Sequence, residues 1–255
     1  MKIVATYSIK GGVGKTAAAV NLGYEASRNG LTTLIWDLDP QGAATYSYRI
    51  KPKVKGGARA VIEGDRDLDD AIRGTDYEDL DLVPADFSFR NFDVLLDEHK
   101  KPTKRVARLL KPMRGTYDLV ILDCPPSLSL GSESVIEACD ALLVPVIPTP
   151  LSIRTLDQLG SFVDDNGLDI TLLPFFSMVH ARRRLHVEAM KELRAKKGTL
   201  LQTVIPASGT IERVSSERAP VAAFAPKTAA ARSFASLWKE TEAALYGKKA
   251  ARRRR

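Results

Sequence analysis

A glycine-rich segment near the N-terminus has the residue types that bind a triphosphate. The segment SIKGGVGKT, residues 8–16, lies between a predicted strand, Lys2–Tyr7, and a predicted helix, Lys15–Asn29. Glycines let the backbone approach phosphates closely and adopt dihedral angles that a Cβ forbids. Successive N–H groups and the start of the helix then attract an anion. The segment therefore predicts a phosphate site, and a glycine-rich turn without a ligand is the alternative.

Two lysines and a hydroxyl in this segment extend the prediction to a magnesium nucleotide. Lys15 can reach the β- and γ-phosphates, and the Thr16 hydroxyl can ligate Mg²⁺. The standard pattern GxxxxGK[ST] would need glycine at Ile9, so the strict pattern fails, and a second lysine stands at Lys10 instead. The residues that we expect to contact the nucleotide are Lys10, Gly11, Gly12, Val13, Gly14, Lys15, Thr16 and Ala17.

The motif KGGVGKT, residues 10–16, resembles the signature of the deviant Walker A ATPases of the ParA/MinD group. The resemblance implies that the cofactors are ATP and Mg²⁺ and that Lys15 contacts the phosphates. It also implies that Lys10 reaches across a dimer interface to the nucleotide of the partner. ATP would then lie between two protomers, and its binding would be coupled to dimerisation.

Carboxylates after two predicted strands agree with this resemblance. The run DLDPQ, residues 37–41, looks like the family's DxDPQ motif; by resemblance Asp39 orients the attacking water and Asp37 supports the magnesium shell. The run LVILDCPP, residues 119–126, resembles a Walker B strand, which implies that Asp123 contacts Mg²⁺ through water. The alternatives are an Asp-Pro turn and a structural aspartate in a buried strand.

A further resemblance concerns the base of the nucleotide. Residues 204–206, Val-Ile-Pro, look like the family's loop after the last core strand, which implies that Pro206 packs against the adenine. Family members usually continue with Arg-Asn, whereas this chain has Ala207 and Ser208. A plain proline at the end of a strand is the alternative.

The elements that must position these residues alternate between strands and helices. Apolar runs predict strands, and the run at Asp118–Asp123 is continuous, as in a parallel sheet covered on both faces. The alternation predicts an α/β fold with a doubly wound, mainly parallel sheet and helices on both faces, as in P-loop NTPases. Besides those given above, the predicted strands are Thr32–Trp36, Leu80–Val83, Ala141–Ile147, Ile170–Phe176 and Leu200–Ile205.

The helix predictions are less uniform along the chain. Residues 41–60 are rich in glycine and lysine and are interpreted as a loop with one helical turn at most. We expect a single ATPase domain over residues 1–247 and a disordered basic tail over 248–255. The predicted helices are Asp67–Arg73, 88–99, 103–113, Gly131–Ala138, Ser152–Asp164, 183–196 and 228–246.

Charge is distributed unevenly along the chain. Residues 181–255 contain 18 Lys/Arg against 6 Asp/Glu, whereas residues 1–150 contain 19 against 21. Such asymmetry suggests a polyanionic partner, and a solvated surface is the alternative. The ParA branch binds DNA without sequence preference through basic residues of its C-terminal part, so the resemblance favours DNA. The candidate DNA contacts are Arg182, Arg183, Arg184, Arg213, Arg218 and Arg232.

Other branches of the family fit less well. A MinD-like protein that binds a membrane surface remains the alternative, but the C-terminal residues 247–255 lack the apolar stripe of an amphipathic membrane helix. Cys124 and Cys139 lack the spacing of a zinc site and do not look placed for a shared cluster, and we expect two buried thiols. The first strand begins at Lys2, so we expect no N-terminal helix-turn-helix and no operator recognition.

The resemblance implies a cycle. ATP forms a sandwich homodimer, the dimer binds non-specific DNA, and an activating partner protein stimulates a slow hydrolysis that releases it. We expect a cytoplasmic, nucleoid-associated protein, because no secretion signal or membrane-spanning run is present.

Overall fold

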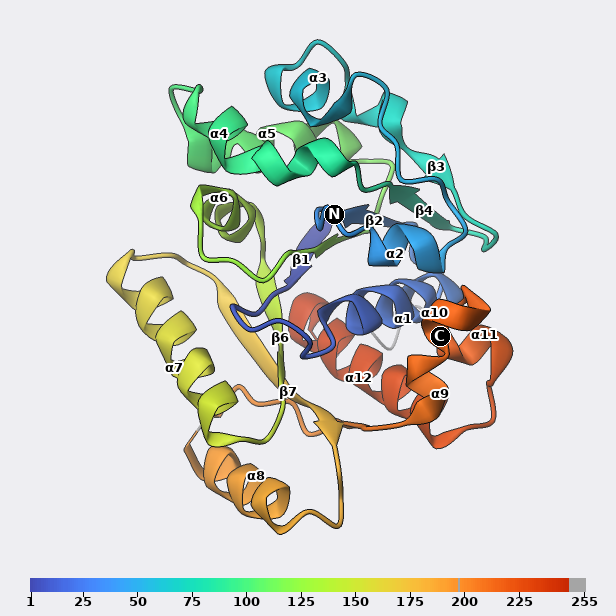
Figure 1. The fold of residues 1–255 in the computed structure, drawn as a ribbon, viewed down its shortest axis with the longest axis vertical. Coiled ribbons are helices and arrows are strands. Elements are labelled where there is room, and N and C mark those ends of the chain that lie inside the picture. The colour runs from blue at the N-terminus through green and yellow to red at the C-terminus, as the bar shows by residue number, and fades with distance from the viewer. Residues whose placement is uncertain (197, 248–255) are drawn as a thin grey trace.

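A parallel sheet organises the molecule (Figure 1). The computed structural model describes residues 1–196 and 198–247, so the predicted basic tail at 248–255 lies outside the described residues. Within them the chain forms one eight-stranded sheet in the order β3-β4-β2-β5-β1-β6-β7-β8. All neighbouring strands are parallel except β3 and β4, which confirms the predicted fold class. The strands are β1 (Lys2–Thr6), β2 (Thr33–Asp37), β3 (Arg73–Gly74), β4 (Leu80–Val83), β5 (Leu119–Asp123), β6 (Ala141–Val146), β7 (Thr171–Val179) and β8 (Val204–Pro206).

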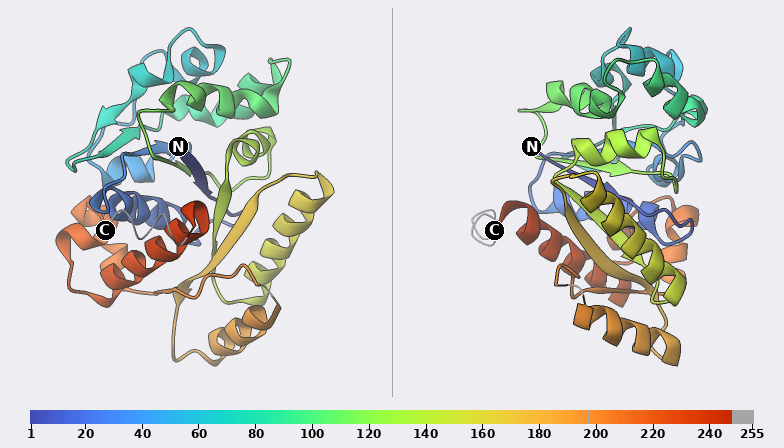
Figure 2. Two further views of the ribbon diagram at one scale, coloured as in Figure 1. Left: turned by 180° about the vertical axis from the view of Figure 1, so that it is seen from behind. Right: turned by 90° about the vertical axis from the view of Figure 1, so that its left-hand side faces the viewer.

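Helices cover both faces of this sheet (Figures 1 and 2). The α-helices are α1 (Lys15–Arg28), α2 (Ala43–Ser47), α3 (Gly57–Glu63), α4 (Phe92–Asp97), α5 (Arg105–Leu110), α6 (Leu130–Ala138), α7 (Pro150–Asp165), α8 (Arg184–Lys196), α9 (Gly209–Glu212), α10 (Val214–Glu217), α11 (Val221–Phe224) and α12 (Ala229–Tyr246). Short 3₁₀ turns are η1 (Leu68–Ala71), η2 (Phe87–Asn91), η3 (Pro102–Lys104) and η4 (Lys111–Met113).

Two apolar layers hold the helices to the sheet. Successive strand residues point to opposite faces, so Ile3 and Ala5 lie in one layer and Val4 lies in the other. The first layer lies under α3 to α7, and the second lies under α1 and α12, which pack against each other. Both layers are continuous along the sheet, so the strand ends that carry the site are fixed from two sides.

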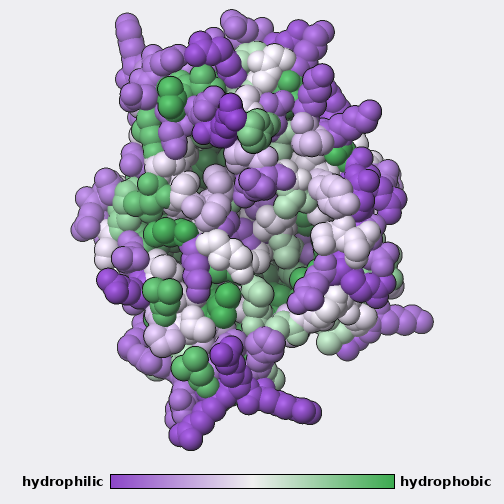
Figure 3. Space-filling model, in the orientation of Figure 1, coloured by the Kyte–Doolittle hydropathy of each residue, from purple (hydrophilic) through white to green (hydrophobic). Residues whose placement is uncertain are grey.

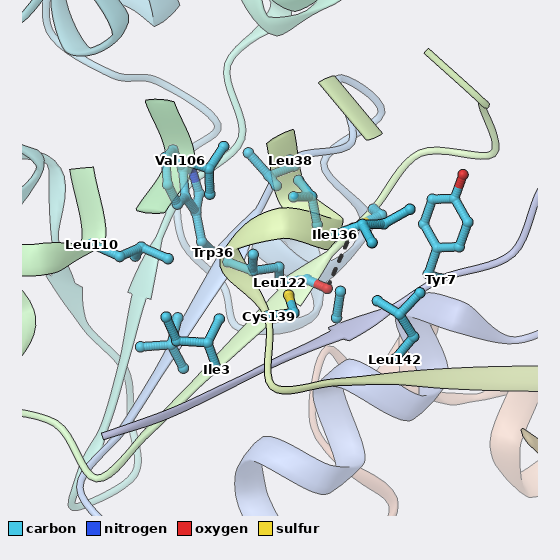
Figure 4. Packing of buried hydrophobic residues seen from close by; sticks show 14 of the residues in the cluster. Ile3, Tyr7, Trp36, Leu38, Val106, Leu110, Leu122, Ile136, Cys139 and Leu142 are labelled. Atoms are coloured by element: carbon cyan, nitrogen blue, oxygen red, sulfur yellow. Dashed lines mark hydrogen bonds between the residues drawn. The ribbon is translucent and has the colours of Figure 1, made fainter. Parts of the chain in front are cut away.

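The two cysteines belong to this core. Figure 4 shows Cys139 beside Trp36, Leu122 and Ile136 in the first layer. Both thiols are free and buried, as predicted. Burial raises the pKa of Cys139 and that of Cys124, which keeps both sulfurs protonated and unreactive.

Residues 41–60 were expected to be loop with one helical turn, and this prediction was only partly right. The segment contains α2 and the first residues of α3, each helix preceded by a glycine in the left-handed region, Gly42 (φ 65°) and Gly56 (φ 83°). The first turn of α2 is anchored because Thr45 donates from its backbone N–H and its hydroxyl to Asp37. A long-range contact therefore supplies helix stability that local composition does not indicate.

The last strand is shorter than expected. Residues 200–203 do not extend β8, because the backbone N–H groups of Gln202 and Thr203 donate to the Glu240 carboxylate of α12 instead. The predicted helices at 88–99 and 103–113 are broken into α and 3₁₀ pieces. The two-residue β3 and the short helices α9 to α11 were not predicted.

Candidate nucleotide site

Three strand ends bring the polar residues of the site together. Thr6 at the end of β1 and Asp37 at the end of β2 both pair in register with Asp123 at the end of β5. The carboxyl ends of parallel strands meet at one edge of a sheet, where ligands of such folds bind. The phosphate loop begins at this edge, directly after β1.

The phosphate loop has the conformation that its glycines permit. Gly12 and Gly14 have φ angles of 68° and 99°, in the left-handed region that side chains disfavour. A Cβ at Gly14 would also lie 2.8 Å from the Ser177 hydroxyl oxygen. The loop leads into α1, whose first N–H groups have no partner within the helix. The loop therefore offers backbone donors to an anion at a place where no side chain intrudes.

The two lysines of the loop occupy different environments. Lys15 is buried, and its ammonium donates to the Lys10 carbonyl oxygen at 3.3 Å. Burial lowers the pKa of Lys15, and the carboxylates of Asp123 and Asp39 oppose this shift. The Lys10 ammonium instead donates to the Ser152 hydroxyl of α7 at 3.2 Å. Lys15 thus faces the loop, while Lys10 points towards a neighbouring helix.

Asp37 fixes the loop that carries Asp39. It is fully buried and accepts hydrogen bonds from the Thr45 backbone at 2.8 Å, the Thr45 hydroxyl at 2.7 Å and the Asp39 backbone at 3.3 Å. Burial raises the pKa of Asp37, and the Thr45 donors oppose the shift. Asp39 accepts from the Gln41 backbone at 3.0 Å and lines the adjoining cavity. The geometry shows that Asp37 holds the loop, whereas its role near the metal stays a prediction.

Asp123 has an oxygen that suits a divalent cation. One carboxylate oxygen accepts from the Thr6 hydroxyl at 3.0 Å, while the other is buried without any partner among the described residues. Burial raises the pKa of Asp123, and the nearby Asp37 carboxylate raises it further. A buried anionic oxygen without a donor is costly unless a cation neutralises it, and Mg²⁺ prefers such oxygens. The Thr16 hydroxyl lies near enough to Asp123 to oppose the rise of its pKa, so the two residues together fit a magnesium site.

A cavity of about 450 Å³ adjoins the loop and is large enough for a nucleotide. One wall is residues 11–18 with Asp39, which places the predicted residues Gly11 to Ala17 there. Residues at the ends of β7 and β8, Pro206 among them, also line the cavity, and contact of Pro206 with the adenine stays a prediction. Sequence reasoning missed several residues that line the cavity from the end of β7, from α9 and from α12: Ser177, Met178, His180, Ile211, Glu212 and Phe234.

Three of the candidate DNA contacts lie together at the start of α8, two directly before it and one as its first residue. Arg182, Arg183 and Arg184 are all exposed, and Arg184 pairs with Glu188 at 2.7 Å. The structure records no acidic partner for Arg182 or Arg183 within the residues it describes. These two guanidinium groups are therefore available to an external anion.

The other three candidates are more engaged with the protein. Arg213 pairs with Glu217 and lies over the Phe224 ring. Arg218 donates to the Tyr46 carbonyl oxygen at 3.0 Å, and its guanidinium carbon lies 4.4 Å from the centre of the Tyr46 ring. Arg232 is exposed and donates to the Lys227 carbonyl oxygen at 2.7 Å. Arg218 thus has a structural role, linking the end of α10 to α2.

Comparisons with known proteins show the family of this chain. A family model for an AAA domain matches residues 1–168. The sporulation initiation inhibitor protein Soj of Bacillus subtilis is 31% identical over 249 residues, covering 95% of this chain and 98% of that protein. The chain belongs to the ParA/MinD-type P-loop ATPases. The chromosome partitioning protein ParA of Myxococcus xanthus is a further relative, 27% identical over 94% of this chain and 87% of that protein.

Solved structures show the same fold for this ParA/MinD-type ATPase. Cobyrinic acid a,c-diamide synthase from Mycobacterium smegmatis, bound to ADP and magnesium, superimposes with a TM-score of 0.82 at 24% identity, over 98% of this chain and 97% of that chain. The Cyanothece McdA–ATP complex gives 0.83 at 20% identity, over 94% and 96%. As a member of this family the chain is an ATP hydrolase. The same synthase has also been solved with a bound ATP analogue and magnesium. Every helix in residues 1–196 and 198–247 lacks the length or apolar content to cross a bilayer.

Proposed function

We propose that this ATPase is a nucleotide-switched positioning protein: ATP drives the formation of a homodimer that binds DNA without sequence preference and moves a cargo. The observation that carries the proposal is the divergent placement of the two lysines. Lys15 lines the nucleotide cavity, whereas the described lining begins at Gly11 and Lys10 contacts Ser152 outside it. An ammonium beside the cavity but outside it is available to the phosphates of a second subunit.

Within each subunit, we assign the site residues the following roles. The backbone of the loop and Lys15 bind the phosphates, with Thr16 and Asp123 as candidates for the metal and Pro206 for the adenine. Bound Mg²⁺ would neutralise phosphate charge during transfer. Asp39 orients the attacking water, and Asp37 keeps the Asp39 loop in place through Thr45. In phosphoryl transfer the protein contributes almost entirely by positioning the reactants and neutralising charge.

DNA binding rests on the basic C-terminal part and on the exposed arginines before α8. Arg182 and Arg183 lie on the segment that follows β7, whose end also lines the nucleotide cavity through Met178 and His180. The relatives include proteins named for chromosome partitioning, which supports a cargo such as a chromosome, plasmid or protein assembly at the nucleoid. An activating partner protein completes the cycle by stimulating hydrolysis and release.

The test is retention of the protein on non-specific DNA with MgATP, with MgADP and without nucleotide. The proposal predicts strong retention on DNA with MgATP and weak retention with MgADP or without nucleotide. Parallel sedimentation with vesicles of anionic lipid distinguishes a membrane-surface protein, which would pellet with vesicles in ATP. Equal DNA retention under all three conditions would contradict the proposal.

A further inference from the structure

An apolar groove with a basic rim lies between α8 and β8, at the end of the sheet. Its volume is about 470 Å³, and it is lined by Val179, Ala181, Val187, Met190 and Val204, with Lys191 and Arg194 at the rim. Over α8, at the bottom of Figure 3, hydrophobic and strongly hydrophilic atoms lie side by side. Val187 is 53% exposed, which leaves an apolar side chain in water. Within the described residues, β8 is the last strand of the sheet and pairs only with β7.

The groove shares two walls with the nucleotide cavity. Along the end of β7, Met178 and His180 line the cavity while Val179 and Ala181 line the groove. In β8, Ile205 and Pro206 line the cavity while Val204 lines the groove. Neighbouring residues of the same two segments therefore line the two sites. A molecule in the groove would therefore contact the segments that hold the nucleotide from behind.

The wall that the two sites share is also irregular. Met178 has a φ angle of 54°, in the left-handed region, and the pairing of β7 with β8 shifts register between Phe176 and Val179. Such a backbone conformation is unfavourable for a residue other than glycine, and it persists only where neighbouring residues hold it in place. A ligand bound on either side of this segment would change the contacts that hold the backbone, so occupancy of one site would affect the other.

The charges at the rim favour an acidic partner. Lys191 has no acidic partner among the described residues, and Arg194 bonds to the neutral Gln202 carbonyl oxygen at 3.1 Å. The nearby acidic side chains of α8, Glu188 and Glu192, are paired with Arg184 and Lys196. The phosphates of a nucleic acid would pair with the basic groups at the rim but leave the apolar residues of the groove exposed to water. An acidic peptide with an apolar side chain would pair with the basic groups and also cover the apolar residues.

We propose that this groove binds an acidic segment of a partner protein, with an apolar side chain of that segment on the Val187–Met190 floor. The inference rests on the proposed function, since it names a partner protein whose binding responds to the nucleotide switch. Because the groove and the nucleotide cavity share walls, binding of the segment and binding of nucleotide are coupled, and the coupling is reciprocal.

The experiment uses the full chain on an array of short peptides. Each peptide has two apolar positions, filled with Leu, Ile, Phe or Met, and its other positions are all acidic, all amide or all basic. The proposal predicts retention on the acidic set and a measurable change in retention between MgATP and MgADP. Equal retention on the acidic, amide and basic sets would overturn it.

Matched variants locate the binding on the groove. Val187→Asn places an uncharged polar side chain at an exposed position. It should weaken retention on the acidic peptides by about tenfold, because the apolar contact is lost. Val94→Asn is the control, because Val94 is an exposed valine of α4 outside the groove. Lys191→Glu should shift retention from the acidic to the basic peptides. Unchanged peptide retention in Val187→Asn, measured on protein with unaltered thermal unfolding, would overturn the proposal.

DNA retention separates this inference from the function on which it rests. The proposal predicts that Val187→Asn keeps the ATP-dependent DNA retention of the parent. Loss of DNA retention without loss of peptide retention would assign the groove to nucleic acid and overturn the inference. If the parent's DNA retention failed to depend on ATP, the proposed function would fall even where peptides bind.

Discussion

Lys10 and Lys15 carry the same group on the same loop, but their surroundings assign them different tasks. Lys15 is buried, and burial lowers its pKa by more than the nearby carboxylates of Asp123 and Asp39 raise it. A triphosphate in the cavity would stabilise the charged ammonium further. Lys10 is held by a hydroxyl of α7, outside the cavity lining. Changes at the two lysines should therefore affect different steps.

Lys15→Ala should lower the affinity for ATP by about 100-fold, because a charge-assisted contact to phosphate is worth about 3 kcal/mol. Isothermal titration calorimetry with a non-hydrolysable ATP analogue and Mg²⁺ measures the change. Lys2→Ala is the control, since Lys2 pairs with Asp140 away from the loop. An affinity equal to that of the parent would show that the phosphates bind elsewhere.

Asp39→Asn should leave ATP binding nearly intact and lower the hydrolysis rate by about 100-fold or more, because the amide cannot orient and polarise water as the carboxylate does. Phosphate release with saturating MgATP and DNA measures the rate. Asp97→Asn, an exposed aspartate of α4, provides the matched control. Hydrolysis at the parental rate in Asp39→Asn would remove Asp39 from the mechanism.

At the scale of elements, the site depends on contacts between distant segments. Asn21 of α1 accepts from the Val221 backbone at 2.7 Å and donates to the Ala17 carbonyl oxygen at 2.8 Å. These bonds tie the helix that follows the phosphate loop to α11, near the start of α12. The helix that presents the loop is thus held by a segment 200 residues away.

Asn21→Ala should lower the free energy of unfolding by about 1–3 kcal/mol, because the buried Val221 N–H loses its acceptor. Urea unfolding followed by circular dichroism measures this change. Asn166→Ala is the control, since the Asn166 side chain bonds only at the exposed end of α7. A loss as small as that of the control would mean that the tie between α1 and α11 contributes little.

The same dependence explains which elements the sequence could predict. Strands β1, β5 and β6 are continuous apolar runs, so their pattern alone indicates burial on both faces. The start of β8 is set by Glu240, and α2 is anchored by the bond from Thr45 to Asp37; neither contact has a local signal. Short helices such as α11 likewise depend on partners that are far away in the chain.

The residues of the site likewise fall into those that the sequence predicts and those that it does not. The phosphate loop, Asp39 and Asp123 are predictable because their spacing and their places after strands are visible in the sequence. Ser177, Met178 and His180 enter the cavity because β7 lies beside β8 and extends past its predicted end. A register shift and a left-handed residue within that strand have no signature that a residue pattern reveals.

At the scale of the whole molecule, charge should decide the partner. The exposed arginines before α8 lie in the basic part of the chain, where residues 181–255 hold 18 Lys/Arg against 6 Asp/Glu. Binding through phosphate contacts releases counterions, so affinity should fall steeply with salt.

Arg183→Ala should weaken DNA binding with MgATP uniformly across sequences and reduce the salt slope by about 1, because one phosphate contact is lost. Fluorescence anisotropy with two unrelated duplexes over a range of salt concentrations measures the slope. Arg59→Ala is the control, since Arg59 pairs with Glu63 on α3. A slope that is the same in Arg183→Ala as in the parent would exclude this side chain from the DNA surface.

The central claim is that ATP joins two copies of the chain through Lys10. Sedimentation velocity of the parent and of Lys10→Ala, each with MgADP and with a non-hydrolysable MgATP analogue, tests it most directly. The parent should sediment as a 27.9 kDa monomer with ADP and at twice that mass with the analogue. Lys10→Ala should bind the analogue but remain a monomer. A parent that stays monomeric with the analogue bound, or a Lys10→Ala variant that dimerises normally, would contradict the claim.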